Sequence, residues 1–242
     1  MKKQRDRQRR VTASIAGVDG CPAGWIAVIE RLGAPLCASI FARFEELLKS
    51  LSDVGVIAVD IPIGLPERGA RDCDVEARRR LGVRGSSVFP APLRPVLNAV
   101  SYEEASRVRF EIEGKRMSRQ AFGIVKKIRE VDLALVESPP ARRKVVEVHP
   151  ELSFATWRGR PMQNSKRKSA GKAERRELIR GHWRDALERC EASFARKACG
   201  LDDLYDAFAA LWSARRVASG VAVQLPVSAP VDKHNLPMRI VA

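Results

Sequence analysis

Short apolar runs separated by turn residues dominate the first sixty positions, a pattern typical of β-strands. Residues 15–30 contain two such runs around the turn sequence Asp19-Gly20-Cys21-Pro22-Ala23-Gly24, which predicts a β-hairpin. Residues 36–41 predict a third strand, and apolar residues spaced three and four apart predict a helix over residues 44–51. Residues 56–61 are too continuously apolar for an exposed strand, so we expect a strand that parallel pairing buries on both faces.

Beyond residue 64 the spacing of apolar residues becomes mostly helical. We expect a helical insertion over about residues 66–140, with helices near 102–113 and 121–135. Residues 144–148 return to a strand pattern, which ends at Pro150 because proline cannot continue a strand ladder. A loop over 158–169, a charged helix over 174–189, an amphipathic helix over 202–218 and a sheet-edge strand over 238–242 follow. The pattern predicts an α/β fold with a basic tail at residues 1–12 and one domain over residues 13–242.

Composition narrows the class of protein. With 242 residues and 45% hydrophobic composition, the chain is long enough to bury a full core. The Lys/Arg-rich start precedes no long apolar run, so we expect neither a signal peptide nor a membrane anchor. The five cysteines form no C-x-x-C pair and lack a histidine at zinc-site spacing, which predicts reduced thiols. These features favour a soluble, cytoplasmic protein over membrane, disulfide-rich secreted and structural zinc proteins.

The positive charge is concentrated in two segments. The net charge is +15, residues 1–10 hold six Lys/Arg against one Asp, and residues 158–189 hold eleven against four acids. Clustered cations suit a polyanionic partner, because phosphate neutralisation supplies most of the non-specific affinity for nucleic acid. A solvated basic surface would have the same composition. Nucleic acid is therefore an expected partner that charge alone does not establish.

Two aspartates end apolar runs that predict strands. Asp19 follows the run 15–18 and precedes Gly20, a position that suits a ligand site at a sheet edge and also suits an ordinary turn. Asp60 follows the apolar run 56–59. An ionised carboxylate there costs about 2–7 kcal/mol unless it is paired, hydrogen-bonded or metal-bound. We therefore favour a functional role for Asp60.

Further acids lie late in the chain. Asp203 and Asp206 are three residues apart in the closing helix, so both carboxylates share one helical face. Acids in a first turn also cap helices, which makes Asp206, one turn further in and flanked by alanines, the stronger candidate. Glu147 either ends a strand beside the site or is the outward residue of a half-buried strand. His149 suits either proton transfer or a structural role.

Carboxylates on rigid elements suit a hard divalent cation. Mg²⁺ and Mn²⁺ favour carboxylate oxygen and water ligands. Our hypothesis is that Asp19, Asp60 and Asp206, aided by Asp203, bind two such ions about 4 Å apart for phosphodiester hydrolysis, with Glu147 as a further catalytic candidate. The side chains expected to position substrate phosphates are Arg84, Lys127, Arg129, Lys166, Arg167 and Lys168.

Several ordered motifs carry a family resemblance over roughly residues 15 to 216. They are Gly17-Val-Asp19-Gly-Cys21-Pro22-Ala-Gly24-Trp25, Val59-Asp60-Ile-Pro62-Ile-Gly64-Leu-Pro66, Arg84-Gly-Ser-Ser87-Val-Phe89-Pro90-Ala-Pro92, Gln120-Ala-Phe-Gly123-Ile, Lys127-Ile-Arg129-Glu130-Val-Asp132, Glu147-Val-His149-Pro150-Glu151 and Asp203-Leu-Tyr-Asp206-Ala207. In these motifs the chain resembles domain-of-unknown-function family 429, whose members are predicted nucleases of the ribonuclease H-like superfamily.

The resemblance implies a fold and a site. It implies a central five-stranded mixed sheet, three antiparallel strands followed by two parallel ones, flanked by helices. The superfamily's first-strand and fourth-strand acids fall on Asp19 and Asp60, and its closing-helix pair falls on Asp203 and Asp206; Glu147 has no equally clear counterpart. The Phe-Pro-Ala-Pro and Gln-Ala-Phe-Gly motifs are not superfamily features, which suggests a family-specific insertion near the site.

Other functions remain open at this point. An actin-like or sugar-kinase-like phosphotransferase also begins with an acid-tipped strand turn, but that fold normally needs two such domains and the chain shows no second phosphate loop. A non-catalytic nucleic-acid-binding protein would keep the fold and the basic surface. A phosphohydrolase acting on small nucleotides or phosphoesters is a third possibility.

Overall fold

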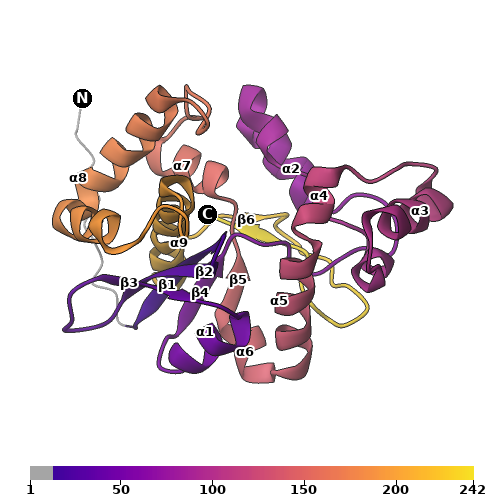
Figure 1. The fold of residues 1–242 in the computed structure, drawn as a ribbon, viewed down its shortest axis with the longest axis horizontal. Coiled ribbons are helices and arrows are strands. Elements are labelled where there is room, and N and C mark those ends of the chain that lie inside the picture. The colour runs from indigo at the N-terminus through magenta and orange to yellow at the C-terminus, as the bar shows by residue number, and fades with distance from the viewer. Residues whose placement is uncertain (1–12) are drawn as a thin grey trace.

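A mixed sheet forms the centre of the protein. A computed structural model describes residues 13–242, and its 5-stranded sheet has the order β3-β2-β1-β4-β5 (Figure 1). The strands are β1 (Ile15–Cys21), β2 (Gly24–Glu30), β3 (Cys37–Phe41), β4 (Val56–Val59) and β5 (Val145–Glu147). β1, β2 and β3 pair antiparallel, whereas β4 is parallel to both β1 and β5. The predicted sheet is confirmed, and the basic tail predicted for residues 1–12 lies outside the described residues.

Helices cover both faces of this sheet (Figure 1). One face is covered by α7 (Pro150–Arg158), α8 (Ser169–Ser193) and α9 (Leu201–Ala218), and the other by α1 (Phe44–Ser50), α5 (Val125–Glu137) and α6 (Pro139–Lys144). Each face of the sheet has its own hydrophobic core under these helices. Side chains alternate across a strand, so one strand contributes to both cores. Ile15 packs with Phe208 of α9, for example, whereas its neighbour Ala16 belongs to the core that contains Phe44 of α1.

The closing helix approaches the sheet unusually closely. A Cβ at Gly17 of β1 would overlap the backbone of Ala207 and Leu211 in α9. Residue 17 therefore has to be glycine for the helix to lie at this distance from the central strand. The close approach fixes the position of α9 directly over β1.

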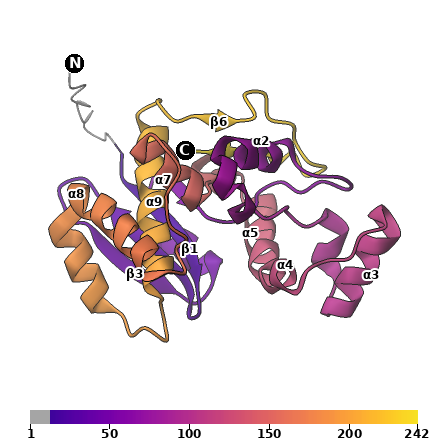
Figure 2. The same ribbon diagram turned by 90° about the horizontal axis from the view of Figure 1, so that it is seen from above.

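The segment 66–140 is helical, as expected, and contains no strand in the described structure. Its elements before α5 are α2 (Asp72–Leu81), the 3-10 helices η1 (Gly82–Ser87) and η2 (Arg94–Asn98), α3 (Tyr102–Glu113) and α4 (Arg119–Gly123). Figure 2 shows α3 and α4 at the end of the molecule opposite α8. The last helix, α5, packs on the sheet instead of standing apart, because Ile128, Val131 and Leu135 form an apolar stripe on one side of it.

Buried ion pairs attach this helical segment to the rest of the protein. Arg71, just before α2, contacts Glu147 of β5 at 2.7 Å and Asp74 at 2.6 Å. Arg94 pairs with Asp132 of α5 at 2.8 Å and also with Asp232 near the C-terminus. Arg71, Asp74 and Glu147 are all buried, so salt in the solvent weakens this attachment little.

The C-terminal strand pairs differently from a simple sheet edge. β7 (Ile240–Val241) forms a two-stranded antiparallel sheet with β6 (Gln224–Leu225), and Val241 also bridges to Val148, the residue after β5. The five cysteines predicted to be reduced are all free thiols. Within residues 13–242, no helix has both the length and the apolar composition needed to cross a membrane.

Candidate metal centre

Three carboxylates from distant parts of the sequence meet at one edge of the sheet. β1 and β4 run parallel with Val18 beside Val59, and the Asp60 N–H donates to the Val18 carbonyl at 3.0 Å. Because parallel strands end at the same edge, Asp19 and Asp60 leave the sheet as neighbours. Asp19 in β1 and Asp60, the residue after β4, lie at positions whose side chains face α9, and α9 carries Asp206. One oxygen from each of the three carboxylates lies within 4.8 Å of the other two.

We call Asp19, Asp60 and Asp206 the aspartate trio. Asp19 and Asp206 are 8% and 1% exposed, and Asp60 is half-buried. Burial, followed by repulsion from Asp60 and Asp206, raises the pKa of Asp19 well above its usual value. Burial and the charge of Asp206 raise the pKa of Asp60 to about 7. The trio therefore gathers negative charge that is unfavourable unless a proton or a cation accompanies it.

One cation is already beside the trio. The Lys166 ammonium, carried by the loop between α7 and α8, forms an ion pair with Asp206. The Asp206 charge is the main reason that the pKa of Lys166 lies above its usual value. The ammonium thus stands where a positive charge is needed. Three clustered carboxylates that already attract a cation are a suitable donor set for Mg²⁺ or Mn²⁺, so these residues could hold a metal ion.

The trio lines a cavity of about 630 Å³. On one side are the sheet edge and α9, and on the other are η1, the segment that follows it, and α4. The residues that line it besides the trio are Gly20, Ile61, Pro62, Arg84, Ser86, Ser87, Phe89, Gln120, Gly123, Ile124, Lys127, His149, Pro150, Glu151, Ser165, Lys166 and Arg167. The helical segment therefore closes what would otherwise be an open sheet edge.

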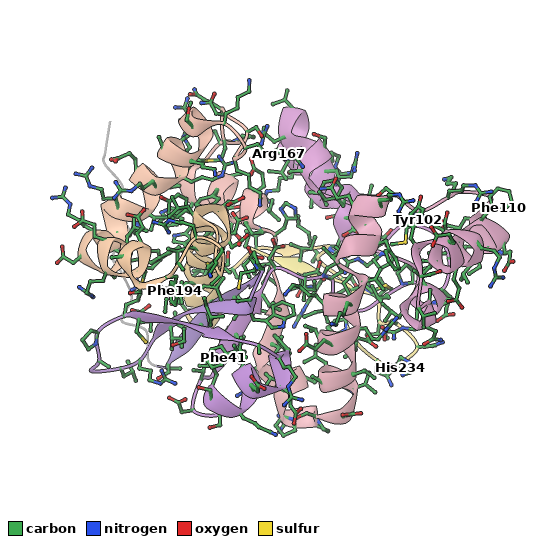
Figure 3. The ribbon with its side chains drawn as sticks, in the orientation of Figure 1. Phe41, Tyr102, Phe110, Arg167, Phe194 and His234 are labelled. Atoms are coloured by element: carbon green, nitrogen blue, oxygen red, sulfur yellow. The ribbon has the colours of Figure 1, made fainter. Side chains whose placement is uncertain are left out.

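Four of the predicted phosphate-binding side chains line this cavity: Arg84, Lys127, Lys166 and Arg167. Arg84 pairs with Glu151 at 3.0 Å. Lys127 donates to the Gly24 carbonyl and lies 4.5 Å from the centre of the Trp25 ring. Arg167 is exposed, and Figure 3 places it beside the gap that separates α2 from the α7 and α8 side of the molecule.

The other two predicted basic residues lie elsewhere. The Arg129 guanidinium donates to the carbonyls of Leu97 and Ala99, the second at 2.8 Å, which ties η2 to α5. Lys168 is exposed at the N-cap of α8. Neither residue lines the cavity. Arg129 is occupied in holding the helical segment together, and Lys168 lies on the surface.

Two predicted acids are not brought into the trio. Glu147 lies in register with Val59, so its side chain faces the opposite side of the sheet from Asp60, which is one residue further along. It accepts from both terminal nitrogens of Arg71 at 2.7 Å and from the Ile63 N–H at 2.7 Å. Asp203 accepts from the Gly200 N–H at 3.0 Å and caps α9. The N-cap of α9 is Gly200, and Asp202 lies in the first turn of the helix.

Several residues that line the cavity were not among the predicted catalytic or phosphate-binding residues. His149 Nε2 lies 3.3 Å from the Ser87 carbonyl, so this nitrogen carries the proton, and burial lowers the pKa of the imidazole. Phe89 and Gln120 are also exposed along the cavity. The sequence could have indicated both residues, because Phe89 lies in the Phe-Pro-Ala-Pro motif and Gln120 in the Gln-Ala-Phe-Gly motif, which were expected near the site.

Comparison with known proteins identifies a family. Searches of curated proteins and of solved structures give no match. One family model, described as "Protein of unknown function (DUF429)", matches residues 17–230. This match spans most of the chain, from β1 through α9, and includes every residue of the aspartate trio. The protein therefore belongs to the DUF429 family.

Proposed function

We propose that the protein is a metal-dependent nuclease with a ribonuclease H-like fold. The observation that carries this proposal is the aspartate trio, whose oxygens lie within 4.8 Å of one another in a cavity that basic side chains also line. The strand order β3-β2-β1-β4-β5, with acids on β1, after β4 and on the closing helix, is the arrangement that the superfamily resemblance implies, and it supports the proposal.

The chain's own residues would divide the work as follows. Asp19, Asp60 and Asp206 would hold Mg²⁺ or Mn²⁺, which supplies an activated water molecule and charge stabilisation at the leaving oxygen. Lys166 would move its ammonium from Asp206 to a substrate phosphate, a shift that a flexible, 44% exposed lysine side chain permits. Arg167, exposed beside the cavity, would bind the adjacent phosphate.

The decisive experiment combines metal binding with cleavage. We expect Mn²⁺ to bind the wild-type protein in calorimetry and to support cleavage of DNA or RNA from a broad panel. Asp60→Asn should lose both, since it removes one charged ligand of three. Asp202→Asn is the matched control, because it removes a carboxylate from the same end of α9 as Asp206 without touching the trio.

Cleavage by the variant, together with nucleic-acid binding and thermal shift with ATP, separates the proposal from its rivals. Cleavage that persists unchanged in Asp60→Asn would rule out the trio as the catalytic centre. Salt-sensitive binding of nucleic acid without any product in Mg²⁺ or Mn²⁺ would instead support a non-catalytic nucleic-acid-binding protein. A large thermal shift with ATP and Mg²⁺ would favour a phosphotransferase.

A further inference from the structure

One wall of the cavity faces the aspartate trio and consists of η1, the segment that follows it, and α4. The part of this wall after η1 is fixed in place. Its central residue, Val88, is buried, and the Val88 carbonyl accepts from Arg78 Nη1 at 2.7 Å. Three residues later, the Ala91 N–H donates to Asp74 at 3.1 Å. Arg84 is held by Glu151 of α7. The wall is thus attached both to α2 and to the helix that follows β5, so the cavity is a preformed feature of the fold.

An exposed aromatic ring stands on this fixed wall. Phe89 lies between the two anchored positions, is 46% exposed and lines the cavity. It makes no contact with another ring among residues 13–242. Ile124, 36% exposed, contributes a second apolar side chain to the same cavity. An exposed aromatic ring in a cavity that also holds charged groups is the kind of surface on which bases stack.

Groups that can recognise the edge of a base lie nearby. The Gln120 side chain lines the cavity and makes no hydrogen bond within the described residues. A primary amide offers two N–H donors and a carbonyl acceptor, so it can pair with the polar edge of an unpaired base. The cavity therefore has acids and a lysine on the side of the sheet and α9. The side of η1 and α4 has Phe89, Ile124 and the Gln120 amide, together with polar groups of η1 that include Arg84. A nucleotide likewise has a charged phosphate at one end and an aromatic base with polar edges at the other.

The size of the cavity limits what enters it. A volume of about 630 Å³ lies within the roughly 300–1,000 Å³ range of small-molecule sites. Double-stranded DNA is instead bound over an extended surface, on the order of 1,000–2,500 Å² of protein. Enzymes that take a base into a pocket act on unpaired or extruded nucleotides, because a base cannot enter a pocket while it is paired and stacked.

We propose that this cavity binds one unpaired nucleotide, with its phosphate at the aspartate trio and Lys166 and its base against Phe89. The inference rests on the proposed nuclease function and names its substrate class. The unpaired nucleotide belongs either to a single strand or to a free nucleoside monophosphate, and both present the same phosphate and base. A paired and stacked base cannot lie against Phe89 in this way, so we expect the cavity not to bind a duplex.

Binding and cleavage are measured separately to test this. Fluorescence anisotropy of a labelled single strand, and of the blunt duplex of the same sequence, is recorded in Ca²⁺, which binds the same kind of oxygen ligand and neutralises the carboxylates. Gels confirm that the probes remain intact. We expect the single strand to bind at least tenfold more tightly than the duplex. Phe89→Ala should weaken single-strand binding by about five-fold to 150-fold, the range for loss of one stacked base.

Two further variants keep the test interpretable. Phe110→Ala is the matched control, because Phe110 is 49% exposed on α3, lies at the edge of the molecule (Figure 3) and does not line the cavity. It should leave binding unchanged. Phe89→Trp retains a stacking ring and should bind like the wild type. Thermal stabilisation by Mn²⁺ should be the same in all three variants, which shows that they are folded and that the trio is intact.

The outcomes distinguish this inference from the proposed function. Equal binding of duplex and single strand, or no effect of Phe89→Ala, overturns the unpaired-nucleotide assignment even if Mn²⁺-dependent cleavage occurs. Single-strand binding that depends on Phe89 supports the assignment, and absence of product with Mn²⁺ then overturns the nuclease function alone. In a competition arm, a nucleoside monophosphate that binds as tightly as the strand assigns the cavity to free nucleotides, whereas tighter strand binding assigns it to single strands.

Discussion

Removing one carboxylate of the aspartate trio should stabilise the metal-free protein. The pKa of Asp60 rises from its usual value of 3.8 to about 7, chiefly through burial and then through the charge of Asp206. This rise corresponds to a cost on the order of 4 kcal/mol for keeping Asp60 ionised in the folded state. Asp60→Asn removes the charge, so above pH 7 the free energy of unfolding should increase, with about 4 kcal/mol as its upper limit.

The pH dependence of unfolding tests separately whether Asp60→Asn stabilises the protein. The folded state holds the Asp60 proton up to about pH 7, whereas the unfolded chain releases it near pH 4. The folded state binds more protons between these values, so stability contributed by Asp60 is present below pH 4 and is lost as the pH rises to 7. The advantage of Asp60→Asn should therefore be absent at pH 4 and complete at pH 8.

Urea unfolding in EDTA at pH 4, 6 and 8 measures this difference. Added Mn²⁺ at about 100 times its dissociation constant should stabilise the wild type by about 2.7 kcal/mol and the variant far less, which narrows the gap. Asp53→Asn is the control, because Asp53 is an exposed partner of Arg31 and should give no gain. The net charge of +15 means that losing an acid confers no general advantage. A variant less stable than the wild type at pH 8 in EDTA would refute the reasoning.

Three further predictions follow from the neighbouring contacts. Lys166→Met should tighten Mn²⁺ binding in calorimetry, because the ion no longer competes with an ammonium at Asp206, and should slow cleavage; weaker Mn²⁺ binding would contradict this. Glu147→Gln should lower the free energy of unfolding by about 3–5 kcal/mol, as expected when a buried ion pair with Arg71 loses one partner, and the remaining folded protein should still bind Mn²⁺. Loss of Mn²⁺ binding at unchanged stability would instead make Glu147 a ligand. Gly17→Ala should force α9 away from β1, so circular dichroism should report a destabilised fold and thermal shift should report no response to Mn²⁺; a normal Mn²⁺ response would show that the helix position is less critical than the packing indicates.

The sheet and the trio could be predicted because their signals are local. Apolar runs marked the strands, and the parallel pairing of the 56–59 run followed from its continuous apolar character. Asp19 and Asp60 lie directly after such runs, and parallel strands end at one edge. Asp206 could be ranked above Asp203 because a first-turn acid has a capping role available, and Asp203 does cap α9.

Glu147 shows that strand register, and not residue type, decides which face of the sheet a side chain occupies. It is an acid at a strand end, like Asp60, but it lies opposite Val59 and so faces the other core. A shift of one residue in register would have turned it toward α9. Nothing in the local sequence gives the register of β5 against β4. In the folded protein Glu147 is paired with Arg71, 76 residues away, on the face of the sheet opposite α9.

The sequence also could not show which basic residues line the cavity and which have structural roles. Arginine is equally able to bind phosphate and to tie loops together through backbone carbonyls, as Arg129 does. The three adjacent residues Lys166, Arg167 and Lys168 meet different surroundings because the chain turns there and enters α8. Only the folded arrangement shows that the first of them reaches Asp206.

The candidate metal centre and the wall that faces it come from different stretches of this chain. The trio comes from β1, the end of β4 and α9, which the central core holds in position, whereas the facing wall comes from η1, Phe89 and α4. Substitutions in that wall can reshape what enters without moving a carboxylate. Under the proposed function, such a division would let new specificities arise through changes in one short segment while the carboxylates stay in place.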